Sequence, residues 1–226
     1  MRGIYIALSL VCFFQMALTQ DRYQLGVMGS VNTKFRMGQD YELNTKLESR
    51  HFISDGPKGI SQGNGFQYER TDMEMIFNRS LGPVSSVGAG YLFRLVGHDK
   101  AVHRAIQQFA IVQRLRGARL AHRFRTDQTW EDGSFRFRFR YRWSLEKALQ
   151  GLEIDPKEFY LKINNECLPT FESNNSDIEI RALASLGYNF SDDMKLETGL
   201  DYRAEQIISP DTEHQCWLAL GWYYSF

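Results

Sequence analysis

The sequence has few cysteines and none of the short motifs that hold a metal or a phosphate. It contains 3 cysteines, and the two beyond the N-terminal segment, Cys167 and Cys216, are far apart in the chain. Their spacing leaves open whether they form one disulfide or stay as two buried thiols. No histidine pair has close ligand spacing, and Gly88 and Gly90 lie within a strand pattern rather than in a phosphate loop. We therefore expect no metal and no cofactor.

An excess of charge of one sign is also missing. The 27 basic residues are balanced by 27 acidic residues. No global field therefore favours nucleic acid or an anionic membrane surface, and we expect no nucleic-acid partner.

Only one long apolar run occurs, and it lies at the start of the chain. Arg2 precedes the apolar segment 4–14, and residues 16–20 form a plausible cleavage zone. The run is shorter than the roughly 20 residues that a spanning helix needs, so a transmembrane anchor is the weaker interpretation. The pattern predicts a signal peptide over residues 1–20 and a mature domain over residues 21–226. That domain is either exported and soluble or inserted in a membrane as a barrel.

Aromatic residues are abundant for so polar a chain. They make up 14% of it, although only 5 prolines occur and the mean hydropathy is -0.41. The interface between lipid and water is one place where such residues sit.

The mature sequence alternates between two kinds of side chain. From Ser134 to Trp143, aromatic residues alternate with arginines, and a pleated strand sends these to opposite faces. A solvated amphipathic strand is the alternative. The same period of two recurs in residues 41–50, 87–95, 178–190 and 196–203.

The strand pattern predicts an all-β fold, an antiparallel transmembrane β-barrel. About eleven segments can be counted, but bacterial single-chain barrels have even strand numbers, so we expect 10 or 12 and favour 12. Short turns are expected at residues 37–40, 78–83, 115–117 and 191–193, and longer loops at 54–64, 97–104, 169–177 and 209–213. This difference predicts short turns on one rim and long loops on the other.

The C-terminal strand has apolar residues at every second position and ends in an aromatic residue. They are Leu218, Leu220, Trp222, Tyr224 and Phe226. The pattern resembles the sorting signal of outer-membrane barrels, although an ordinary buried strand could also end at Phe226. It predicts that the protein is in the outer membrane, with lipid and the barrel assembly machinery as partners.

Four stretches carry a resemblance to a known family: residues 47–50, 136–143, 186–190 and 197–203. With them, nearly the whole mature chain resembles the bacterial outer-membrane-type barrels classed as domain of unknown function 2490. The resemblance implies the fold and the location. It implies no activity, because that family has none assigned.

If the aromatic face meets lipid, the opposite face lines the lumen with charge. The expected lumen ladder comprises Arg123, Arg125, Arg136, Arg138, Arg140, Arg142, Glu48, Arg50, Glu197, Asp201 and Arg203. Other acids on the same polar phase, among them Asp127, Glu166 and Glu179, could compensate the arginines. The result is either a structural salt-bridge plug or a narrow pore that attracts small anionic solutes.

Two other functions remain as alternatives. An exported soluble barrel of lipocalin type, binding a ligand, would bury the aromatic face and expose the arginines. An outer-membrane enzyme acting on lipid would need a nucleophile and a base, and the suggestive histidines are His51, near Ser54 and Asp55, and His98, beside Asp99. No nucleophile motif surrounds either one, so we expect no catalytic residues. The oligomeric state is left open.

Overall fold

The computed structural model describes residues 22–57, 63–97, 100–131, 133–172, 175–209 and 212–226. The expected signal peptide, residues 1–20, lies outside these ranges. Within them no helix is long and apolar enough to cross a membrane. The described chain forms the strands β1 (Arg22–Met37), β2 (Tyr41–Pro57), β3 (Gly63–Ser80), β4 (Ser85–Val96), β5 (Lys100–Leu115), β6 (Ala118–Glu131), β7 (Ser134–Ala148), β8 (Glu158–Glu172), β9 (Asn175–Asn189), β10 (Met194–Glu205) and β11 (Glu213–Ser225).

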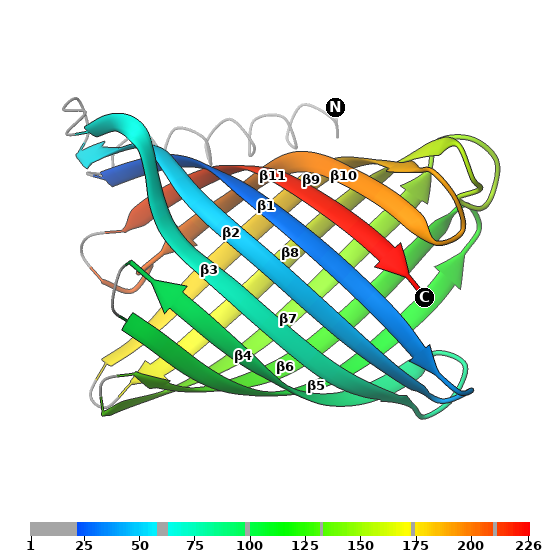
Figure 1. Ribbon diagram of the computed structural model, residues 1–226, viewed down its shortest axis with the longest axis horizontal. Helices are drawn as coiled ribbons and strands as arrows, with labels where there is room; N and C mark the ends of the chain where they lie inside the picture. Colours follow the sequence, from blue (N-terminus) through cyan, green and yellow to red (C-terminus); the bar gives the residue numbers. More distant parts are fainter. Residues whose placement is uncertain (1–21, 58–62, 98–99, 132, 173–174, 210–211) are drawn as a thin grey trace, which may run out of the picture.

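These strands close into one barrel (Figure 1). Each strand pairs antiparallel with its neighbours in sequence, and the barrel closes where β1 pairs parallel with β11, from Arg22 opposite Glu213 to Lys34 opposite Ser225. The all-β barrel is therefore confirmed. The described strands number eleven rather than 10 or 12. An even number is required only when every pair is antiparallel, and the parallel seam removes that requirement.

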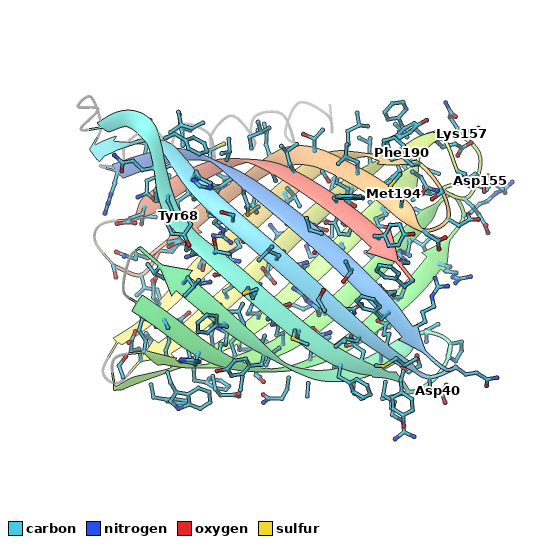
Figure 2. The ribbon with its side chains drawn as sticks, in the orientation of Figure 1. Asp40, Tyr68, Asp155, Lys157, Phe190 and Met194 are labelled. Carbon is cyan, nitrogen blue, oxygen red and sulfur yellow. The ribbon has the colours of Figure 1, made fainter. Side chains whose placement is uncertain are left out.

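The two ends of the barrel are defined by the seam strands. β1 and β11 both start at one end, here called the N-terminal rim, and both finish at the other, the C-terminal rim. Figure 2 shows Asp40, Asp155 and Phe190 at the C-terminal rim, and Tyr68 lies toward the N-terminal rim.

The stretches expected as short turns connect strands at the C-terminal rim and those expected as loops connect strands at the N-terminal rim, as predicted, but the predicted contrast in length is wrong. The longest connection, residues 149–157, shares the C-terminal rim with the two-residue turn 116–117. The stretch expected as a loop at 169–177 instead continues β8 and β9 almost to their hairpin. Polar residues extend these strands because every second side chain faces a polar interior, so polarity in this chain does not mark loops.

Apolar side chains face outward and charged side chains face inward. On β7, Phe135 and Phe139 are 48% and 37% exposed, whereas Arg140 between two aromatic neighbours is 7% exposed. β10 repeats the arrangement, with Leu200 exposed and Asp201 buried. This orientation is the opposite of the one that a lipocalin-type soluble barrel would have.

The C-terminal residues singled out from the sequence all lie on the outer face. Leu218, Leu220, Trp222, Tyr224 and Phe226 are between 37% and 62% exposed. Phe226 also stacks on Phe35 of β1, with ring centroids 4.5 Å apart, and its backbone N–H donates to the carbonyl oxygen of Lys34 at 2.8 Å. The last residue therefore helps to fasten the parallel seam at the C-terminal rim.

The two cysteines that the structure describes are both free. Cys167 lies on β8 and Cys216 on β11, with β9 and β10 between them. Three strand spacings amount to about 14 Å, well beyond the roughly 7 Å limit for the Cα atoms of a disulfide. Of the two alternatives left open by the sequence, the structure therefore supports two free thiols rather than a disulfide.

Candidate functional site in the barrel lumen

The candidate site is built from the inward-facing residues, which are every second residue along each strand. Nearly all of the predicted ladder lines one lumen cavity: Glu48, Arg50, Arg123, Arg125, Arg138, Arg140, Arg142, Glu197, Asp201 and Arg203. Arg136 is the exception, because it lies next to the N-terminal rim and its Nε donates to Glu172 at 2.7 Å. This hydrogen bond holds the pKa of the half-buried Glu172 carboxyl below its usual value.

One carboxylate, Asp127 on β6, gathers arginines from three strands. It is fully buried and accepts from Arg125 at 2.9 Å, from Arg138 at 2.8 Å and from Arg140 at 3.3 Å. Arg104 of β5 approaches to 3.8 Å. Asp127 lies on the face predicted from the sequence, whereas Arg104 was not predicted, because its strand has a weak alternating pattern.

A second carboxylate, Glu166 on β8, also accepts hydrogen bonds from several arginines. Arg140 donates to it at 2.9 Å, and Arg123 and Arg142 each donate at 3.3 Å. Arg181 of β9 lies 3.8 Å away. Arg140 therefore bridges two buried carboxylates, and the arginine stripe of β7 is held from both sides.

Around these two hubs, smaller ion pairs complete the lumen wall. Arg94 donates two hydrogen bonds to Asp72, at 2.6 and 2.7 Å, and Arg203 donates to Asp201 on its own strand. Lys162 donates to Glu197 at 2.9 Å. Arg94 and Lys162 were not predicted, although both occupy the polar phase of their strands and that phase could have identified them.

Two aromatic side chains pack among the ion pairs inside the barrel. Trp217 is 0% exposed and its ring is 5.0 Å from that of Phe52. The guanidinium groups of Arg50 and Arg203 lie over the Trp217 ring, at 5.7 and 6.0 Å from its centroid. Gly26 makes the packing feasible, because a Cβ there would overlap the indole. Trp217 itself does not line the cavity, but the two arginines that lie over its ring do.

The cavity itself has a volume of about 460 Å³ and reaches Lys34 and Ser225 near the C-terminal rim. Fourteen lysine and arginine side chains line it, against six acidic ones: Glu48, Asp72, Glu74, Glu166, Glu197 and Asp201. Asp127 and Glu179 do not line the cavity themselves, but each forms an ion pair with an arginine that does. The inner surface is therefore basic.

Several arginine nitrogens in this wall have no hydrogen-bond partner among the described residues. They are Arg50 Nη1, Arg70 Nε, Arg123 Nε, Arg140 Nε and Arg203 Nη1, and all are buried. Every one of these arginines lines the cavity. A buried donor without an acceptor is costly. These nitrogens are themselves closed to solvent, so an anion in the cavity would meet the other donors of the basic lining.

The histidines considered from the sequence do not form a catalytic triad in the described part of the chain. His51 Nε2 lies 3.1 Å from the Oγ of Ser49, not Ser54, on the outer face of β2, and its Nδ1 is buried without a partner. The third group that usually orients such a base is thus missing. His98 and Asp99 lie outside the described residues. No cluster of metal-ligating side chains occurs among the described residues.

Comparison with known proteins finds one family. The family model described as "Protein of unknown function (DUF2490)" matches residues 25–214. No curated protein and no solved structure matches the chain.

Proposed function

The chain belongs to the DUF2490 family of proteins of unknown function, and from its lumen we propose that it is an outer-membrane β-barrel that holds small anions in an arginine-lined cavity. The observation that carries the proposal is the excess of basic over acidic side chains on the cavity lining, fourteen against six. Guanidinium groups match the geometry of phosphate, sulfate and carboxylate, which are the ligands we propose.

The membrane location is supported by the outer face. Large apolar side chains are exposed on it from all sides of the barrel, for example Leu47 (46%), Met75 (55%) and Leu200 (59%). A closed barrel pairs its backbone groups between strands, which is the condition for crossing a bilayer with strands. The outward C-terminal aromatic residues and the signal peptide expected from the sequence support export through the assembly machinery of a Gram-negative envelope.

Retention, rather than free passage, is supported by the burial of Trp217. This indole is 0% exposed and packs against Phe52 inside the barrel, where it narrows the lumen. The cavity lining, by contrast, continues to Lys34 near the C-terminal rim. Small anions would enter from the C-terminal rim and exchange their water for guanidinium donors, and any current through the barrel would be small and anion-selective.

The location is tested by expressing the full precursor in a Gram-negative host and separating the membranes. We expect a band in the outer-membrane fraction whose gel mobility changes on boiling. A soluble protein with unchanged mobility would overturn the proposal and favour an exported ligand-binding barrel.

The lumen is tested with the purified barrel and inorganic phosphate. Arg123→Gln and Arg142→Gln remove charge from arginines whose side chains are 23% and 31% exposed and whose ion pairs, among the described residues, are with Glu166. We expect each variant to weaken phosphate binding, measured by equilibrium dialysis, and to reduce anion selectivity in a planar bilayer. Arg116→Gln, in an exposed turn, is the control with the same change of charge. Equal binding by the wild type and both lumen variants would contradict the proposal.

A further inference from the structure

The outer face of β5 and β6 carries a polar patch among apolar residues. The side chains of Gln107 and Gln128 exchange two hydrogen bonds, 3.1 and 2.9 Å long, and Thr126 donates to the Gln107 carbonyl oxygen at 2.6 Å. Gln107 lies in the middle of β5 and is exposed. We call these three residues, with Ala89 and Ala105 beside them in the ladder, the outer polar patch.

The patch lies between aromatic pairs that mark the two ends of these strands. Trp130 contacts Phe135 toward the N-terminal rim, with ring centroids 5.7 Å apart. Toward the C-terminal rim, His122 Nδ1 and the Tyr141 hydroxyl are 2.9 Å apart. Aromatic residues of this kind belong at the lipid interfaces, so in the proposed membrane location the patch faces hydrocarbon.

In hydrocarbon, some hydrogen-bond donors of the outer polar patch have no acceptor. Each amide carries two N–H donors, and the reciprocal pair uses one from each glutamine. The second N–H of each has no partner among the described residues, and a lipid tail offers no acceptor. Polar side chains facing lipid are expensive and usually meet another protein surface.

We propose that two copies of this chain associate in the membrane through the outer polar patch. A primary amide is both donor and acceptor, so the patch is complementary to itself, as an interface around a two-fold axis requires. Ala89 and Ala105 have small side chains that do not protrude beside the glutamines, so two barrels can approach closely there. The closed barrel has no free strand edge, so the contact is made by side chains. This inference rests on the proposed membrane location.

The test uses the full-length protein in lipid vesicles, with the fraction of dimer measured by single-molecule photobleaching at increasing lipid dilution. We expect the wild type to dimerise and Gln107→Leu/Gln128→Leu to weaken the dimer by about tenfold or more, since interhelical polar contacts in membranes reach similar values. Gln113→Leu, the same substitution at an exposed outward glutamine near the C-terminal rim end of β5, is the matched control and should leave the dimer intact. Change of gel mobility on boiling shows that each variant has folded.

Cysteine cross-linking provides a second, independent measurement. In a Cys167→Ser/Cys216→Ser background, Ala105→Cys should form a covalent dimer in membranes, whereas Ala182→Cys, on the outer face of β9, should not. A membrane-inserted barrel that stays monomeric at every dilution, or a double leucine variant that dimerises like the wild type, would overturn the association. Neither result would affect the proposed location or anion binding, which fail only in the fractionation and phosphate experiments.

Discussion

Replacing Asp127 by asparagine should destabilise the barrel more than any exposed substitution. The asparagine retains the size of the side chain but removes the charge that three arginines contact directly and a fourth approaches at 3.8 Å. Loss of one partner of a buried ion pair costs about 3–5 kcal/mol.

We expect the lower end of that range, because most of the arginines keep a second partner. Arg125 still donates to Glu74, Arg140 to Glu166, and Arg104 to the Thr129 hydroxyl at 2.9 Å. A loss of about 3 kcal/mol corresponds to roughly a hundredfold change in the unfolding equilibrium.

The assay is a urea titration of the barrel in vesicles, in which the folded fraction is the band with altered mobility on an unboiled gel. Asp40→Asn, at the exposed turn between β1 and β2, is the control and should change stability by less than about 0.5 kcal/mol. Adding Arg138→Gln to Asp127→Asn removes one of the excess cations and should restore part of the loss. An Asp127→Asn protein within about 1 kcal/mol of the wild type would refute the assignment of Asp127 as the hub of the lumen.

Three further substitutions test other parts of the barrel. Trp217→Ala should cost about 3–5 kcal/mol and raise single-channel conductance, because it removes a fully buried ring from the lumen; an unchanged conductance would show that the indole does not limit passage. Gly187→Ala should lower the folded fraction, since its Cβ would overlap the Tyr160 ring, and Tyr160→Leu should partly restore folding if this overlap is the cause. Glu172→Gln should cost at most about 1 kcal/mol at neutral pH, where the partly solvated carboxylate accepts from Arg136. Because the folded pKa of Glu172 is lowered, this stabilisation is present above the unfolded pKa and disappears as the pH falls through the folded value, so urea titrations of variant and wild type should converge in acid.

The sequence alone determined the fold class and the two faces of the sheet. Its period of two reports a property of each strand by itself, since a pleated backbone sends neighbours such as Phe139 and Arg140 to opposite sides wherever the strand lies. For the same reason the inward arginines of β6 and β7 and the outward C-terminal residues were identified from the pattern. Arg136 was placed on the correct phase but proved to lie at the rim, because phase carries no information on height in the barrel.

Only the tertiary structure decided how the barrel closes and which side chains pair in its lumen. The parallel seam between β1 and β11 joins residues 191 apart in the chain, as in the contact of Arg22 with Glu213, and no local pattern encodes whether such a seam is parallel. The pairing of Glu166 with Arg123 depends on the tilt of β6 and β8 on either side of β7. The separation of the two cysteines and the placement of Trp217 over the ion pairs likewise follow from how the sheet curves. Alternation fixes which way a side chain points, whereas the curvature and stagger of the closed sheet fix which side chains it meets.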